Sequence, residues 1–266
     1  MNGLARRVAD AGLDWIIPDW DVSPRVHVLS TTRHGGVSSG AQATLDLGAA
    51  AIPSGDGAAA ILENRRILAR FLPAPPVWLA QRHGADIAKV DASNAPAMIV
   101  SPPTADAAVT REPNLVLCVR TADCLPVVIA DRAGTTVAIA HAGWRGLAAG
   151  ILEAAVASLN CVADDVVAWL GPAIGPRSFE VGRDVYDAVC ARYPDIAECF
   201  MSKGNGKWLA DLYEIARRRL AGVSVPRVTG GDYCTTLDAA RFFSYRRERD
   251  TGRMATLIWI DAEPRP

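Results

Sequence analysis

The chain has 266 residues and a mass of 28.2 kDa, a size that α/β folds often fill with one unit, so we expect a single domain over residues 1–266. Half of the residues are hydrophobic and 21% are charged, a composition that is ordinary for globular proteins and argues against disorder. The 28 basic and 29 acidic residues give a net charge of −1, which excludes the strong basic field needed for non-specific nucleic-acid binding.

Two further features bear on the compartment. Met1 to Trp15 contain no apolar stretch as long as a secretory signal, and no run of about 18 uncharged apolar residues predicts a membrane span. Six cysteines without a CxxC pair are typical of reduced thiols. We therefore expect a cytoplasmic protein whose partners include neither membrane nor nucleic acid; the sequence indicates no oligomeric state.

The predicted elements are short, and strands outnumber helices about two to one. Helical periodicity or composition predicts helices over residues 58–72, 147–159, 181–192 and 208–220. Short β-branched segments predict strands over residues 25–30, 77–79, 87–90, 115–119, 126–130, 135–140, 166–170 and 256–260. The turn residues 131–134 predict a hairpin between two of these strands, 203–207 predict a second turn, and 242–247 predict a half-buried strand. The pattern favours a mixed or antiparallel α+β fold.

Chemically capable side chains gather in three short segments at the ends of predicted strands. These segments are Gln81–Gly84, Thr121–Pro126 and His141–Gly146. Strand ends hold side chains rigidly at the edge of a loop-lined cleft, which is where sites are commonly built.

His83, Cys124 and His141 are 41 and 17 residues apart, so only tertiary folding can bring them into one site. Two imidazoles and a thiolate suit zinc, and three protein ligands leave a fourth coordination position open, as in catalytic zinc sites. The same atoms also fit a metal-free site, in which His141 activates Cys124 as a nucleophile and Asp123 or His83 orients the base. A third interpretation is a core thiol and two unrelated histidines in a non-catalytic binding module.

An arginine offers a further candidate contact. Arg33 follows the first predicted strand, in the segment Thr31–Gly36, and its guanidinium can act as a fork for an anion. A solvated loop arginine is the other interpretation of the same residue.

Seven motifs, taken together, resemble the YfiH-type family, which older usage labels multicopper polyphenol oxidase or laccase and newer usage purine nucleoside phosphorylase. They run in order through residues 25–260 and read TTRHGGVS (31–38), QRHGADI (81–87), ADAAVT (105–110), RTADCLPVV (120–128), HAGWRG (141–146), GPAIGP (171–176) and FFSYRRERDTGRMA (242–255). Family members usually carry asparagine where this chain has Asp46, a difference that we expect to alter polar contacts in the cleft.

The resemblance implies a layered α/β/β/α fold with mixed sheets and a catalytic zinc site formed by His83, Cys124 and His141. It also implies phosphorolysis of purine nucleosides (adenosine, inosine, guanosine, methylthioadenosine), with adenosine deamination as a second reaction. Arg33 matches the arginine of the first family motif and would serve substrate or phosphate. Arg145, in the motif HAGWRG, is a candidate for supporting the cleft, and pairing inside the fold is its other interpretation. The alternative that remains is a metal-free cysteine amidohydrolase that uses Cys124 and His141, with a cell-wall precursor as one conceivable substrate.

The implied reactions make different demands on the protein. Zinc held by one thiolate and two imidazoles lowers the pKa of its water to about 7, which suits deamination. Phosphorolysis needs cations for phosphate, for which Arg33 and zinc itself are the candidates. It also needs a proton for the leaving base, for which Asp123 and a zinc-bound water are the candidates.

The older laccase label conflicts with the number of histidines. A multicopper oxidase needs a blue-copper site with two histidines and a cysteine, and also a trinuclear cluster with many more imidazoles. The chain has four histidines, so copper bound by the same three ligands would be adventitious.

Overall fold

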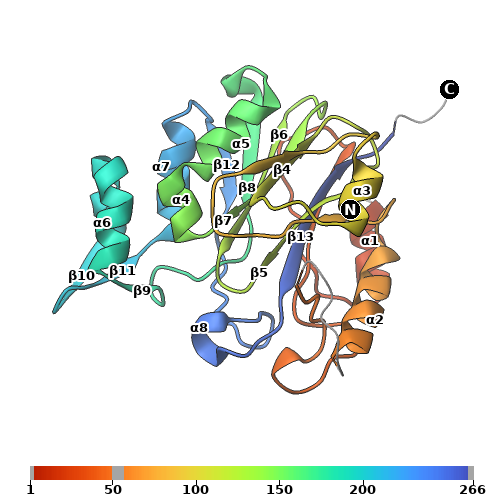
Figure 1. Ribbon diagram of the computed structural model, residues 1–266, viewed down its shortest axis with the longest axis horizontal. Coiled ribbons are helices and arrows are strands. Elements are labelled where there is room, and N and C mark those ends of the chain that lie inside the picture. Colours follow the sequence, from red (N-terminus) through yellow and green to blue (C-terminus); the bar gives the residue numbers. More distant parts are fainter. Residues whose placement is uncertain (1–2, 50–56, 263–266) are drawn as a thin grey trace.

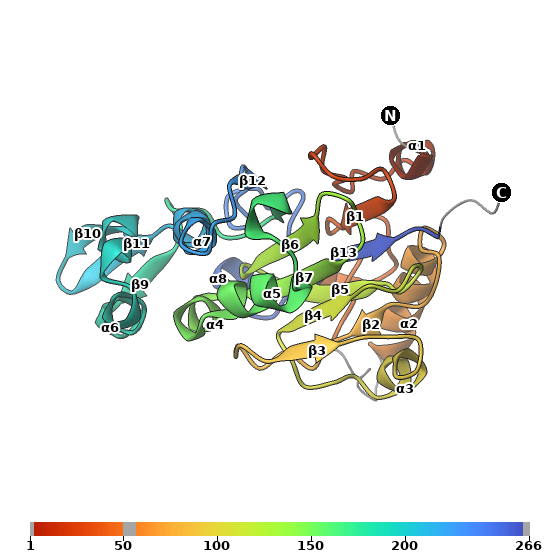
Figure 2. The same cartoon turned by 90° about the horizontal axis from the view of Figure 1, so that it is seen from above.

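The computed structural model describes residues 3–49 and 57–262 and shows two facing β-sheets with helices on their outer sides (Figure 1). A third, small sheet lies at one end of the molecule, away from helices α1 (Gly3–Asp10) and α2 (Ala58–Ala69) (Figure 2). From one outer face of the paired sheets to the other, the layers are helix, sheet, sheet, helix. The α/β/β/α arrangement with mixed sheets that the sequence implied is therefore confirmed.

The larger sheet has six strands, and both of its faces are covered. Its order is β12 (Arg227–Gly230), β8 (Val166–Leu170), β6 (Leu125–Asp131), β7 (Val137–Ala142), β4 (Ala107–Thr110) and β3 (Ile87–Lys89). Strands β6 and β7 form the predicted antiparallel hairpin, whereas the outer pairs β12–β8 and β3–β4 are parallel. Every residue of β6 and β7 is buried, which explains why their sequences are apolar without alternation.

The second sheet has four strands and packs against the first. Its order is β1 (Val26–Ser30), β13 (Met254–Ile260), β5 (Leu117–Thr121) and β2 (Val77–Trp78). Apolar side chains from the two facing surfaces fill the space between the sheets, among them Val119 and Ile258 from this sheet and Val128 and Ile139 from the larger one. Burial of this area is the main stabilising contribution to the sandwich.

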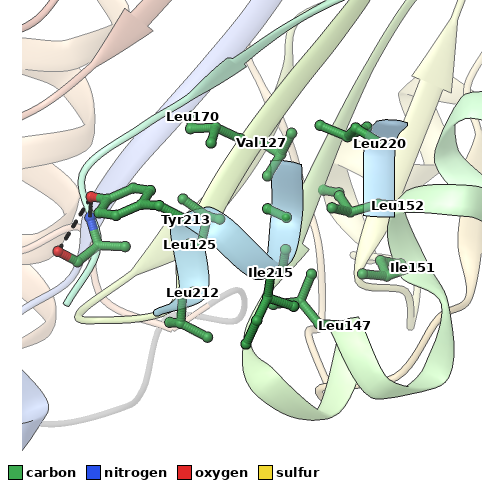
Figure 3. Close-up of a cluster of buried hydrophobic side chains, with 14 of the residues drawn as sticks. Leu125, Val127, Leu147, Ile151, Leu152, Leu170, Leu212, Tyr213, Ile215 and Leu220 are labelled. Atoms are coloured by element: carbon green, nitrogen blue, oxygen red, sulfur yellow. Dashed lines mark hydrogen bonds between the residues drawn. The ribbon is translucent and has the colours of Figure 1, made fainter. Parts of the chain in front are cut away.

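Helices close the two outer faces. The larger sheet is covered by α4 (Trp144–Ala149), α5 (Ile151–Leu159) and α7 (Leu212–Ala221), whose leucines and isoleucines pack on β6 (Figure 3). The hydroxyl of Tyr213 in this core donates to the carbonyl of Tyr233 (2.9 Å) and accepts from the backbone N–H of Ala173 (2.8 Å). The four-stranded sheet is covered by α1 (Gly3–Asp10) and α2 (Ala58–Ala69).

The remaining elements are small. The third sheet has the order β10 (Phe200–Gly204), β11 (Lys207–Ala210) and β9 (Glu180–Gly182), and α6 (Arg183–Arg192) follows β9. Two short helices, α3 (Ala95–Val100) and α8 (Tyr245–Glu248), lie in connections, as do three 3₁₀ turns at Gly40–Gln42, Ala163–Asp165 and Pro194–Cys199. Within the described residues, no helix has both the length and the apolar character needed to cross a bilayer.

Most predicted elements are confirmed, but three helix predictions are wrong in part. The helix predicted over 181–192 begins at Arg183, since residues 181 and 182 belong to β9. The helix predicted over 208–220 begins only at Leu212, because Asp211 caps it by accepting the Glu214 N–H (3.0 Å); residue 208 belongs to β11. The helix predicted over 147–159 is two helices, since Gly150 has φ +89° and interrupts the hydrogen-bonding pattern.

The strand predicted over 242–247 is wrong. Phe242 and Phe243 are fully buried between the sheets, and Ser244 then caps α8 by accepting the Arg247 N–H (3.2 Å). The alternation of aromatic and polar residues that suggested a strand arises instead from two anchoring rings followed by a capped helical turn.

Candidate active site

His83, Cys124 and His141 converge, as the metal and the nucleophile interpretations both require. Their ligand atoms all lie within 4.8 Å of one another, and no other group of three such residues occurs in residues 3–49 and 57–262. The two imidazole rings have centroids 4.8 Å apart and planes inclined by 70°. This His–Cys–His cluster, as we call the three residues, can hold a metal ion.

The cluster lies where the chain crosses between the two large sheets. Cys124 ends the link from β5 in the four-stranded sheet to β6 in the six-stranded sheet, and His83 lies on the link from β2 to β3. His141 lies in β7 and pairs with Pro126 of β6, so the hairpin brings it beside Cys124. The three segments that looked unrelated in sequence thus meet at one edge of the sandwich.

Gly143 provides the space that the thiol needs. This glycine follows β7, and a Cβ placed on it would lie 2.8 Å from Cys124 Sγ and 3.5 Å from a ring carbon of His83. The approach to Cys124 Sγ is shorter than real Cβ atoms make, whereas that to His83 is an ordinary contact, so any side chain here would push on the thiol. Glycine in the motif HAGWRG is therefore explained by the close approach of backbone to thiol.

Asp106 organises the cluster from behind, and our sequence analysis did not single it out. It is 1% exposed, and its Oδ1 accepts from His141 Nδ1 (2.9 Å) and from the backbone N–H of His83 (2.9 Å). Its Oδ2 accepts from the backbone N–H groups of Arg82 (2.9 Å) and Gly84 (2.8 Å). The carboxylate therefore fixes the ring of one cluster histidine and the backbone of the other, which has φ +63°.

The charges of the cluster reinforce one another. Burial raises the pKa of Asp106, but the His141 bond and the three backbone donors outweigh it and lower that pKa to about 2. Burial likewise raises the pKa of the Cys124 thiol, yet the attraction of His141 and hydrogen bonds from both imidazoles lower it below its usual value. The pKa of His141 is lowered by burial and raised more strongly by Cys124 and Asp106. A thiolate is thus favoured, which both metal ligation and nucleophilic attack need.

The cluster opens into a cavity of about 460 Å³, which we call the site cavity. It is lined by Gln81, His83, Arg120, Thr121, Ala122, Cys124, His141, Arg145, Tyr245 and Arg253. A neighbouring cavity of about 310 Å³ shares Arg120 and Arg253 with it and adds Asp46. The volume of the site cavity falls in the range that small-molecule ligands occupy.

Asp123 does not line the site cavity, although the sequence placed it among the candidate catalytic residues. Its Oδ1 accepts from the Thr235 hydroxyl (2.6 Å) and its Oδ2 from the backbone N–H of Arg246 (2.6 Å). Its own carbonyl accepts from the Ile174 N–H (2.9 Å). Both carboxylate oxygens are engaged inside the fold, so the surroundings of Asp123 indicate an anchor and not a proton donor.

Arg33 also lies outside the lining of the site cavity. Its Nε and Nη1 donate to the carbonyls of Ala43 and Ala239 (both 2.9 Å), and its guanidinium stacks 4.8 Å from the Phe243 ring centroid. These contacts hold two loops together and keep Arg33 out of the cavity lining, so its predicted role in anion binding stays a prediction. Arg145, in contrast, does line the site cavity, as the prediction required.

Arg120 and Arg253 also line the site cavity, although the sequence did not identify them as site residues. Both lie inside quoted motifs, RTADCLPVV and FFSYRRERDTGRMA, but nothing in their spacing shows that β5 and the start of β13 are adjacent. Asp46, the departure from the usual asparagine, accepts from the backbone N–H groups of Gly48 (2.9 Å) and Arg253 (2.8 Å) through Oδ1. An asparagine oxygen can accept the same two bonds, so the change adds charge without requiring new donors.

Comparison with known proteins connects this geometry to a family. The family model described as multi-copper polyphenol oxidoreductase laccase matches residues 27–261. The chain belongs to this family. Two curated members, purine nucleoside phosphorylase PA4543 of Pseudomonas aeruginosa and purine nucleoside phosphorylase YfiH of Escherichia coli, are each 46% identical over 247 residues, which cover 92% of this chain and 98% of each relative. A crystal structure of Neisseria meningitidis protein NMB0706 has a TM-score of 0.88 at 44% identity and covers 94% of this chain and 100% of its own.

The family's laccase description does not fit the histidines of this member. His27 Nε2 is hydrogen-bonded to the Asp261 carboxylate (2.7 Å), and its ring stacks on Trp259. His34 Nδ1 lies 3.3 Å from Asp14 Oδ1. Only His83 and His141 remain for metal ligation in the described part of the chain. Two imidazoles and one thiolate provide one metal site, whereas multicopper oxidation requires a second, imidazole-rich cluster.

Proposed function

We propose that this protein is a purine nucleoside phosphorylase whose active centre is the His–Cys–His cluster with a bound zinc ion. The convergence of His83, Cys124 and His141 at the floor of the site cavity is the observation that carries the proposal. The names of relatives that are 46% identical over nearly the whole chain support the purine nucleoside and phosphate substrates.

The donor set fits zinc. One thiolate and two imidazoles are borderline-soft ligands that would hold zinc and leave one coordination position for water or substrate, and all three line a cavity of ligand size. The hydrogen bond from His141 Nδ1 to Asp106 directs the other ring nitrogen toward the cluster, as second contacts of metal-bound histidines usually do. When bound, zinc supplies a Lewis acid that polarises a substrate oxygen or nitrogen and activates water near neutral pH.

The chain's own residues supply position and charge. Burial of Asp106 and its four accepted bonds hold the cluster histidines in one arrangement before substrate arrives, so little reorganisation is required during reaction. The open site cavity admits a nucleoside beside the cluster, where its glycosidic bond can meet phosphate. We further propose adenosine deamination at the same centre as a second reaction.

Product analysis tests the proposal. Purified zinc-loaded protein is incubated with adenosine, with and without phosphate, and the products are separated by chromatography. Formation of adenine and ribose 1-phosphate only when phosphate is present supports phosphorolysis, and formation of inosine without phosphate supports deamination. If protein containing one zinc per chain forms neither a purine base nor inosine, the proposed function is rejected.

One observation favours a second candidate, a metal-free cysteine amidohydrolase. The hydrogen bonds that run from Asp106 through His141 to Cys124 have the connectivity of a catalytic triad. This candidate predicts amide hydrolysis that survives chelation and is lost on alkylation of Cys124. Turnover that is lost on chelation and regained with zinc contradicts it.

A further inference from the structure

The wall of the site cavity carries an unusual charge. Three of its ten described lining residues are arginines, Arg120, Arg145 and Arg253, and none is a carboxylate. Asp46 lines the neighbouring cavity, and its Oδ1 already accepts two backbone N–H groups. Positive charge in a partly enclosed space attracts an anion strongly, because the low local dielectric screens it less than water does.

The three arginines differ in how many N–H groups they have left. Arg120 is committed to the fold, since its Nη1 and Nη2 donate to the carbonyls of Gly48 (2.7 Å) and Leu79 (2.8 Å). Its Nε is buried and has no partner among the described residues. It therefore contributes charge from behind the wall more than it contributes free donors.

Arg253 and Arg145 keep donors for a ligand. Arg253 uses Nη1 for the carbonyls of Thr251 (2.9 Å) and Gly252 (3.0 Å), and its Nε and Nη2 have no partner among the described residues. Arg145 is exposed, makes no hydrogen bond or ion pair within the described chain, and stacks with its guanidinium 4.3 Å from the Trp144 ring centroid. Stacking orients the guanidinium plane and leaves its edge N–H groups available.

Like charges crowd this wall. Burial lowers the pKa of Arg120 to about 10, and repulsion from Arg65 and Arg253 acts in the same direction, whereas Asp46 opposes it. An anion bound between the guanidinium groups relieves this repulsion, so the arrangement favours an occupied state over an empty one.

We propose that Arg145 and Arg253 form the subsite for inorganic phosphate, with Arg120 supplying supporting charge. This inference rests on the proposed function, because phosphorolysis needs a bound phosphate nucleophile next to the nucleoside. Guanidinium forks match the spacing of phosphate oxygens and bind them through paired hydrogen bonds. These residues take the place of Arg33, which does not line the site cavity.

The subsite gives the reaction a defined direction of attack. A phosphate oxygen forms a bond to the ribose carbon that carries the base while the bond from that carbon to the base nitrogen breaks. The base leaves with the bonding electron pair and takes up the proton that the attacking hydrogen phosphate gives up, so the products are ribose 1-phosphate and the free purine. Arg145 and Arg253 hold phosphate oxygens other than the one that attacks.

The test is a titration of the full-length, zinc-loaded protein with inorganic phosphate by calorimetry, which requires no turnover. We compare the unaltered chain with Arg145→Gln, Arg253→Gln and the charge-preserving Arg253→Lys. Arg183→Gln is the matched control, because Arg183 is an exposed arginine (73%) on α6, outside the site cavity. Circular dichroism and zinc content verify that each variant is folded and loaded.

We expect both glutamine variants to weaken phosphate binding about tenfold, Arg253→Lys to weaken it less, and Arg183→Gln to bind as the unaltered chain does. In turnover, KM for phosphate should rise in parallel while KM for the nucleoside stays nearly constant. Unchanged phosphate affinity in folded Arg145→Gln and Arg253→Gln overturns the subsite even if phosphorolysis is observed. Weakened binding in both, with no phosphorolysis by any variant, supports the subsite and rejects the proposed function instead.

A second titrant separates free phosphate from a phosphate that belongs to the substrate. Adenosine 5′-monophosphate is compared with phosphate and adenosine added together. If the monophosphate binds more tightly, and that binding depends on Arg145 and Arg253, the subsite is not one for inorganic phosphate. Tighter binding of phosphate with adenosine supports the proposal.

Discussion

The two walls of the site cavity are built on different principles. The cluster wall is formed by His83, Cys124 and His141 and is held by hydrogen bonds within the fold. Asp106 accepts four of these bonds and fixes both histidine segments. The arginine wall retains unused donors on Arg145 and leaves its positive charges without a carboxylate in the cavity. The difference indicates that the first wall is preorganised by the fold, whereas the second is completed by the ligand.

The largest effect should come from removing a ligand of the cluster wall. Cys124→Ala deletes the thiolate without leaving a buried charge unpaired on Asp106, so we expect a folded protein that has lost its metal and turns over on the order of a thousandfold more slowly. Elemental analysis, circular dichroism and product assays check this. Cys161→Ala is the matched control, because Cys161 is exposed and unpaired. Global unfolding of Cys124→Ala, with the control intact, would make the cluster structural.

A smaller loss should follow when the cluster keeps its ligands but loses their support. In Asp106→Asn one acceptor oxygen becomes an NH₂ donor that faces backbone N–H groups, so the loop of His83 and the ring of His141 are no longer both held. We expect metal affinity and turnover to fall about 10- to 100-fold. Competition with a chelator measures the affinity, and Asp187→Asn on exposed α6 serves as control. Equal zinc affinity in Asp106→Asn and the control contradicts the preorganisation of this wall.

Much of the fold could be predicted from sequence because local patterns decide it. The β6–β7 hairpin followed from two apolar runs around a turn, and the amphipathic helix α2 followed from its periodicity. Strand β4 was missed, since Ala107 and Ala108 carry little strand propensity and are buried only through pairing with β7. Phe242 and Phe243 were misassigned because tertiary burial and the Ser244 cap override the alternating pattern.

The sequence predicted the three possible metal ligands of the candidate site but not the residues that surround them. His83, Cys124 and His141 stand out by residue type, and the motifs drew them together. The bonds that Asp106 accepts from the cluster segments span 22 to 35 residues of sequence, and no local spacing reveals them or the place of Arg253 in the cavity. In sequence, an arginine that is free to bind phosphate looks the same as one that is held by backbone carbonyls. The bonds from Arg33 to the carbonyls of Ala43 and Ala239 are visible only in the structure.

Asp123 allows the two walls to be separated experimentally. It anchors Thr235 and the backbone of Arg246, next to Tyr245 of the site cavity, and does not contact the cluster through its carboxylate. In Asp123→Asn one of these two bonds is lost, so we expect about 1–3 kcal/mol less stability and a severalfold rise in KM. Zinc content should stay at the level of the unaltered chain. A pH–rate profile that loses one limb in Asp123→Asn would instead restore the proton-donor role.

Arg33→Gln should give the smallest effect on turnover and a clear effect on stability. The side chain is 15% exposed, and its loss leaves the carbonyls of Ala43 and Ala239 without their donors and removes the contact with Phe243. We expect unfolding to become easier by about 1–3 kcal/mol, while KM for phosphate stays as in the unaltered chain. Denaturant titration and steady-state kinetics below the unfolding transition separate the two quantities. A raised KM for phosphate at unchanged stability would return Arg33 to the substrate and contradict the assignment of phosphate to the arginine wall.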